Sequence, residues 1–128
     1  DIRQMQRLAA LCPGAAIYAG NDDQAYTMMA LGARGVISVV ANVLPTAVHE
    51  MAASYLRGDV ELSREMQFAL LDIIDALFIE VSPIPVKAAL AMMGKIEDEL
   101  RLPLAPLDVE KRLRLRAAMT ALDLLEDG

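Results

Sequence analysis

The lysines at positions 87, 95 and 111 are the side chains of this sequence that could act as amine nucleophiles. An amine attacks a carbonyl carbon only when it is unprotonated, so a nucleophilic lysine needs a desolvated site. Lys87 lies among apolar residues, but it follows Pro85 on a helix near the carboxyl end of the chain. We therefore interpret Lys87 as a structural lysine, hydrogen-bonded or extended to solvent. Lys95 and Lys111 have polar neighbours and are expected to be solvated, so we predict no catalytic residue in the chain.

Other side chains that could do chemistry lack partners in the sequence. His49 is the only histidine, and a metal site would need further ligands that are not apparent, so we predict neither a metal nor a cofactor. Cys12 has no histidine at a suggestive spacing and is interpreted as an incidental or buried thiol. Asp72 and Asp75 could pair as general acid and base on one helix face, but a solvated stripe explains them more simply. Residues 97–99 are a charged loop without the alternating spacing of a calcium site.

Composition limits the class of protein. With 128 residues, 55% of them hydrophobic, the chain can form one packed domain. Its net charge of −6 argues against a non-specific nucleic-acid binder, and its longest apolar run, at 68–81, is interrupted by acidic residues and too short for a membrane span. A single cysteine excludes an internal disulfide and fits a cytoplasmic location. Because the chain starts at Asp1 and continues directly as a predicted helix, we expect it to be a fragment.

The first half of the chain alternates between helices and strands. Helical spacing at 2–11 stops at Pro13 and Gly14, and a short apolar strand is predicted at 15–20. A helix follows Asp22, with a buried stripe of Ala25, Met28, Met29 and Gly32. Residues 35–40 read as a strand that is apolar on both faces. Pro45 starts a helix that ends at Gly58 and has an apolar stripe of Val48, Met51, Ala52, Tyr55 and Leu56. This order predicts an α/β fold with parallel strands.

The second half is predicted to be helical throughout. Apolar residues line one face of a long helix, which must end before Pro83: Leu62, Met66, Leu70, Ile73 and Leu77. Pro85 opens a helix that runs to Met93, and Asp108 is a predicted N-cap of a last helix to about Leu125. We therefore divide the chain into residues 1–58 and 59–128. Two parallel strands cannot cover their own helices, so the first part should be completed by a barrel or a wider sheet.

Four blocks of sequence, in the same order and at similar spacing, resemble the carboxyl-terminal part of the dihydrodipicolinate synthases, within the pyruvate-dependent class I aldolase and lyase family. The blocks are Ala-Gly-Asn-Asp-Asp at 19–23, Gly-Val-Ile-Ser-Val-Val-Ala-Asn-Val at 35–43, Pro-Ile-Pro-Val-Lys-Ala-Ala-Leu at 83–90 and Glu-Leu-Arg-Leu-Pro-Leu at 99–104. The resemblance implies the last part of a (β/α)8 TIM barrel, residues 1–58, followed by a three-helix extension, residues 59–128. It also implies a homo-oligomer, usually a tetramer.

The resemblance further implies a reaction. Pyruvate forms a Schiff base with a lysine of the sixth strand, and the enamine attacks aspartate semialdehyde on the path to diaminopimelate and lysine. That lysine would lie a few residues before Asp1, so the chain alone should be inactive and should need the missing amino-terminal barrel segment as its partner. Ile37 resembles the position whose backbone carbonyl faces the pyruvate-derived group, and Gly20 the glycine that lines the substrate entrance. Asn21 and Asp22 are expected to shape that loop, with Asp22 a possible cap of the next helix.

Two other functions stay open. The chain could be a non-catalytic assembly or interaction module, since the helical extension of the family makes subunit contacts. It could also belong to a sister pyruvate aldolase, such as a sialic acid lyase or a keto-deoxy sugar acid aldolase. The strand at 35–40 is more typical of the synthase, because the sister enzymes usually have more glycine there.

Overall fold

The computed structural model describes residues 1–125 as a helical chain. Its elements are, in order, α1 (Ile2–Leu11), η1 (Asp22–Gln24), α2 (Ala25–Ala30), η2 (Val40–Asn42), α3 (Pro45–Leu56), α4 (Val60–Ala69), α5 (Leu71–Leu77), α6 (Ile84–Met92) and α7 (Val109–Thr120), where η denotes a 3₁₀-helix. The contacts divide the chain into an N-terminal unit, Asp1–Ala69, and a C-terminal unit, Leu70–Gly128. No helix among residues 1–125 combines the length and apolarity that crossing a membrane requires.

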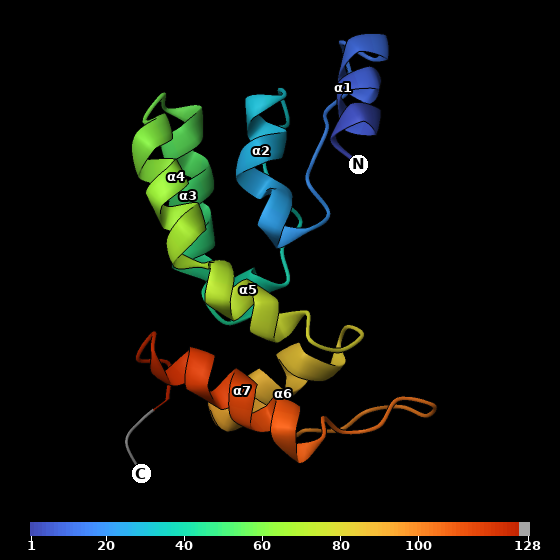
Figure 1. Cartoon of the computed structure of the whole chain (residues 1–128), viewed down its shortest axis with the longest axis vertical. Helices are drawn as coiled ribbons and strands as arrows, with labels where there is room; N and C mark the ends of the chain where they lie inside the picture. Colours follow the sequence, from blue (N-terminus) through green and yellow to red (C-terminus); the bar gives the residue numbers. More distant parts are fainter. Residues whose placement is uncertain (126–128) are drawn as a thin grey trace. The chain divides into compact units, whose positions relative to one another are not determined.

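Small residues and methionines form the core of the N-terminal unit. Helices α2, α3 and α4 lie side by side, coloured blue to light green in Figure 1, and α3 packs most extensively on α4. The core cluster consists of Ala19, Ala25, Met28, Met29, Ala33 and Met51. The predicted stripe of α2 is confirmed at Ala25, Met28 and Met29, whereas Gly32 is exposed and, with φ +98°, lies past the helix end.

The two predicted strands are reduced to a single parallel bridge between Ala19 and Val36, so the strand prediction at 15–20 and 35–40 is wrong for the residues that the structure describes. Three backbone hydrogen bonds surround the bridge: Arg34 N–H to the Ile17 carbonyl (2.8 Å), Ala19 N–H to the Gly35 carbonyl (2.9 Å) and Ile37 N–H to the Ala19 carbonyl (2.8 Å). The pairing stops because η1 begins at Asp22 and η2 at Val40. Apolarity alone could not predict these turns.

Helix α3 agrees with the predicted start and end. Pro45 is its first residue and Gly58, at φ +93°, follows its last turn. Val48 and Met51 are buried as predicted, but Leu56 is exposed and Ser54 is buried instead. A serine fits here because α3 and α4 pack closely, and Ser63 of α4 is also fully buried.

The predicted long helix is interrupted at Leu70, which separates α4 from α5 and has φ −91° and ψ −7°. Neither proline nor glycine marks this break in the sequence. The apolar stripe from Leu62 to Leu77 continues across the break, so periodicity predicted one helix. The buried residues also recur at helical spacing across it: Ser63, Gln67, Leu70, Ile74 and Leu77. Leu62, predicted on the buried stripe, is 42% exposed. The break coincides with the boundary between the two units.

In the C-terminal unit, α5, α6 and α7 pack on one another (Figure 1) around Ile73, Leu77, Ala88, Leu115 and Met119. Asp108 caps α7 as predicted, since its Oδ1 accepts a hydrogen bond from Lys111 N–H at 2.9 Å. Helix α7 ends at Thr120, five residues short of the predicted end at Leu125. The predicted division at residue 58 concerns the boundary between barrel and extension, and it stays a prediction. The two units described here are defined by contacts alone and meet at residues 69 and 70.

Candidate functional site

Gly20 and Ile37, the two residues predicted to bind substrate, lie next to each other at the carboxyl end of the parallel bridge. Ile37 N–H donates to the carbonyl of Ala19, the residue before Gly20. Both are exposed, Ile37 to 73%. A Cβ added at Gly20 would have no atom within 4 Å, so the glycine leaves open space on this side.

The Ile37 carbonyl is available to a ligand. In a regular parallel ladder, the bond after Ile37 N–H to Ala19 would run from Asn21 N–H to the Ile37 carbonyl. Among residues 1–125, no hydrogen bond of this kind is formed, because the chain turns into η1 after Asn21. A backbone acceptor without a backbone donor therefore lies at the carboxyl end of the bridge.

Asp22 fixes the backbone that follows Ile37. Asp22 is 4% exposed, and its carboxyl group accepts hydrogen bonds from the Ser38 hydroxyl, from Val39 N–H at 2.8 Å and from Val40 N–H at 3.4 Å. The Ser38 hydroxyl in turn accepts from Ala41 N–H at 2.8 Å. All three groups around the carboxyl are donors, as a buried carboxylate requires. The idea that Asp22 caps the helix after it is wrong, because the carboxyl binds the turn into η2.

Gln67 is a residue of this site that the sequence did not reveal. Its carboxamide is buried on α4, where Nε2 donates to the Asp22 carbonyl at 3.1 Å and Oε1 accepts from Tyr26 N–H at 3.3 Å. The two partners fix the orientation of the amide, since one must be an acceptor and the other a donor. Gln67 follows Met66 directly and was not part of the predicted apolar stripe, so the sequence pattern gave no signal for it.

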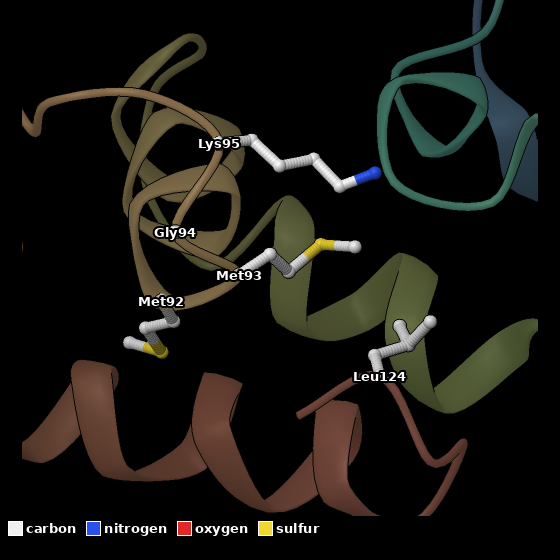
Figure 2. A pocket seen from close by; sticks show the side chains of 5 residues that line it. All are labelled: Met92, Met93, Gly94, Lys95 and Leu124. Carbon is white, nitrogen blue, oxygen red and sulfur yellow. The ribbon is translucent and has the colours of Figure 1, made fainter. Parts of the chain in front are cut away.

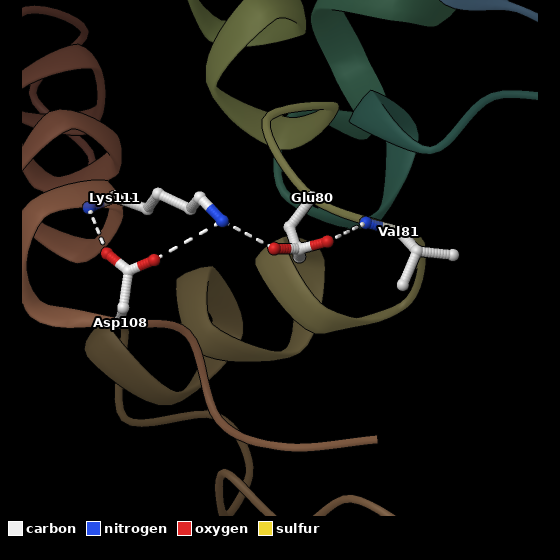
Figure 3. Close-up of polar contacts among 4 residues, drawn as sticks. All are labelled: Glu80, Val81, Asp108 and Lys111. Carbon is white, nitrogen blue, oxygen red and sulfur yellow. Dashed lines mark hydrogen bonds and ion pairs between the residues drawn. The ribbon is translucent and has the colours of Figure 1, made fainter. Parts of the chain in front are cut away.

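The lysines of the C-terminal unit are engaged with nearby oxygen atoms. Lys87 Nζ donates to the Glu99 carbonyl, which confirms the structural interpretation of this lysine. Lys111, expected to be solvated, instead lies between two carboxylates, with Nζ 2.5 Å from Glu80 Oε2 and 3.2 Å from Asp108 Oδ2 (Figure 3). The Glu80 hydrogen bond, followed by that of Asp108, raises the pKa of Lys111. Residues 1–125 contain no cluster of three His, Cys, Asp or Glu side chains suited to a metal ion.

Comparison with known proteins identifies the family. Residues 1–122 match the Dihydrodipicolinate synthetase family. The chain belongs to this family. It is 50% identical over 105 residues to the 4-hydroxy-tetrahydrodipicolinate synthase of Acetivibrio thermocellus, a match that covers 81% of this chain and 36% of that protein.

A second relative is matched along the whole chain. The 4-hydroxy-tetrahydrodipicolinate synthase of Thermoanaerobacter pseudethanolicus is 43% identical over 129 residues, which cover 100% of this chain and 43% of the relative. The crystal structure of dihydrodipicolinate synthase from Thermotoga maritima has a TM-score of 0.95 and 43% identity, and covers 98% of this chain and 44% of that one. The fold is thus related to that of the dihydrodipicolinate synthase barrels. This family member spans about two fifths of the length of the proteins that it matches.

The chain has two cavities that are not lined by Gly20 or Ile37. One, of about 410 Å³, is lined by Met92, Met93, Gly94, Lys95 and Leu124 (Figure 2). Of these residues only Lys95 is charged, and its side chain extends away from Met92 in Figure 2. The other, of about 310 Å³, lies in the N-terminal unit and includes Tyr18, Arg34 and His49. Neither cavity includes Gly20 or Ile37.

Proposed function

We propose that this chain is the carboxyl-terminal part of a (β/α)8-barrel lyase that condenses pyruvate with aspartate semialdehyde through a lysine Schiff base, in lysine and diaminopimelate biosynthesis. The observation that supports it best is the open Ile37 carbonyl beside Gly20, at the end of a parallel bridge. Family membership supports the reaction class, and the positions of Ile37 and Gly20 support their proposed roles in it. The setting would be the cytoplasm.

Each residue of the site has a role in this proposal. The partial negative charge of the Ile37 carbonyl oxygen faces the pyruvate-derived group and stabilises the positive charge of its imine. Gly20 leaves the substrate entrance open, because it has no side chain and no neighbouring atom within 4 Å of an added Cβ. Asp22 and Ser38 shape the loop and strand end around these two residues.

The Schiff-base lysine is proposed to come from sequence that precedes residue 1. The carboxylates of Glu80 and Asp108 raise the pKa of Lys111 and so favour its protonated, unreactive form. Lys87 Nζ is engaged with the Glu99 carbonyl. Lys95 is exposed to solvent. None of the three offers the desolvated amine that the chemistry needs, so the chain alone is expected to be inactive.

A hybrid enzyme tests this proposal. The segment of the Thermoanaerobacter pseudethanolicus relative that precedes its matched region is joined to Asp1 of this chain, and turnover is assayed. We expect condensation of pyruvate with aspartate semialdehyde by the hybrid and none by either part alone. A folded hybrid that instead cleaves sialic acid or a keto-deoxy sugar acid would contradict the proposal in favour of a sister aldolase.

An assembly role is a second candidate, supported by exposed apolar residues on α7. Val109 and Leu113 are 76% and 62% exposed and lie four residues apart, so they share one helix face. Such a surface is typical of a contact between subunits. A homo-oligomer through this face predicts that Leu113→Lys lowers the mass measured by analytical ultracentrifugation, whereas an unchanged mass would exclude the contact.

A further inference from the structure

A series of hydrogen bonds connects α4 with the backbone of the proposed substrate site. Gln67 holds the main chain at Asp22 and Tyr26, and the Asp22 carboxyl holds the backbone N–H groups of Val39 and Val40. Ile37 lies two residues before Val39, and Gly20 lies two residues before Asp22. One buried amide is thus bonded to the loop that contains Gly20 and, through Asp22, to the strand end that contains Ile37.

We infer that Gln67 is a positioning residue for the pyruvate-binding backbone, acting through Asp22 on the Ile37 carbonyl. That this backbone binds pyruvate rests on the proposed function. That Gln67 holds the backbone in place does not depend on it. It gives α4, which the sequence assigned to the helical extension, a role in the site. Gln67 makes none of its contacts with Ile37 itself.

The chemistry of the carboxamide explains why glutamine is suited to this position. The Asp22 carbonyl and Tyr26 N–H are four residues apart, a pair that a regular α-helix would join directly. Gln67 inserts between them at the junction of η1 and α2, with a donor for one and an acceptor for the other. Leucine could satisfy neither group, and an ionised glutamate would set a second acceptor against the Asp22 carbonyl.

Burial makes these bonds costly to lose. Gln67 and Asp22 are both 4% exposed, so water cannot readily replace a missing partner. Without the amide, the Asp22 main chain loses its hydrogen bond to α4. The Asp22 carboxyl group is then no longer held in the orientation that accepts hydrogen bonds from Val39 and Val40. Movement of these two residues changes the direction of the Ile37 carbonyl, because the peptide planes are consecutive.

The first test uses the 128-residue chain and measures amide hydrogen exchange by NMR. In Gln67→Leu and Gln67→Glu, we expect exchange at Val39 and Val40 to accelerate about tenfold or more, as the loss of a buried hydrogen bond implies. Exchange in α7, at Leu115, should stay unchanged and serves as the internal reference. The matched control is Gln6→Leu, an exposed glutamine on α1. Unchanged exchange at Val39 and Val40 in both variants would overturn the inference.

The second test uses the hybrid enzyme and separates positioning from general stability. We expect Gln67→Glu to raise KM for pyruvate by about tenfold, with a smaller change in kcat, because pyruvate is the ligand of the displaced carbonyl. An unaltered KM for pyruvate in a folded variant would contradict the inference. If the unsubstituted hybrid forms no pyruvate adduct, the proposed function fails, and the exchange measurement still decides whether Gln67 positions this backbone.

Discussion

At the scale of single residues, Ser38 joins the site to the turn that follows it. Its hydroxyl donates to the Asp22 carboxyl and accepts from Ala41 N–H. We expect Ser38→Ala to destabilise the N-terminal unit by about 1–2 kcal/mol, since a buried carboxylate loses one donor and Ala41 N–H loses its acceptor. Urea unfolding followed by tyrosine fluorescence checks this, because the three tyrosines, at 18, 26 and 55, all belong to that unit.

The control for Ser38→Ala is Ser82→Ala, which removes the hydroxyl of an exposed serine in the C-terminal unit. Its tyrosine-detected transition should match that of the unsubstituted chain. Equal midpoints for both variants would contradict the role given to the Ser38 hydroxyl.

The ion cluster of Glu80, Asp108 and Lys111 predicts a pH dependence. The Lys111 hydrogen bond, the Val81 N–H bond and the Lys111 charge lower the pKa of Glu80 from its ordinary 4.5. The stabilisation from Glu80 is therefore present above pH 4.5 and lost as the pH falls through the lowered pKa. The pKa of Lys111 is raised instead of lowered. The stabilisation of the folded state by Lys111 is therefore complete below pH 10.5 and is lost as the pH rises through the raised pKa.

NMR titration of the Glu80 carboxyl group tests this cluster directly. In Lys111→Met, the pKa of Glu80 should move upward toward its ordinary value, because the largest cause of the lowering is removed. Lys95→Met is the matched control, since Lys95 is exposed in the same unit. A Glu80 pKa that is the same in the Lys111 variant and the control would refute the ion pair.

At the scale of elements, helix α3 contains a buried methionine and an exposed leucine of similar size. Met51 is 2% exposed in the core of the N-terminal unit, whereas Leu56 is 61% exposed. We predict that Met51→Ala lowers the free energy of unfolding by about 2–5 kcal/mol through the cavity that it leaves. Leu56→Ala should change it by less than about 0.5 kcal/mol. Tyrosine-detected urea unfolding measures both, and similar losses would contradict the burial of α3.

The limits of several helices were predictable because proline and glycine mark them. Pro45 and Gly58 bound α3, and Asp108 caps α7. The break between α4 and α5 at Leu70 has no such marker, and apolar periodicity continues through it. The strands were predicted from apolarity, which does not reveal that η2 begins at Val40.

The candidate site was predictable only in part. Gly20 and Ile37 were singled out by the family resemblance, and the bridge between Ala19 and Val36 makes them neighbours. The bonds that hold them there join residues distant in sequence, Asp22 with Ser38 and Gln67 with Asp22. Local secondary-structure propensity carries no information about such long-range contacts, so only the structure reveals the hydrogen bonds of Gln67.

At the scale of the whole molecule, the proposal divides the reaction between two segments of sequence. This chain is proposed to supply a backbone acceptor at Ile37 and an open entrance at Gly20. It spans about two fifths of the length of its relatives. The reactive amine is proposed to lie in the remaining part. Shared active sites of this kind are common in barrels, where residues from several strand ends meet at one face.

The most direct test of this division is reduction with borohydride in the presence of pyruvate, followed by mass spectrometry of the intact protein and its peptides. The hybrid should gain one reduced pyruvate adduct on a lysine of its added segment, and the 128-residue chain alone should gain none. An adduct on Lys87, Lys95 or Lys111 of the isolated chain would contradict the account.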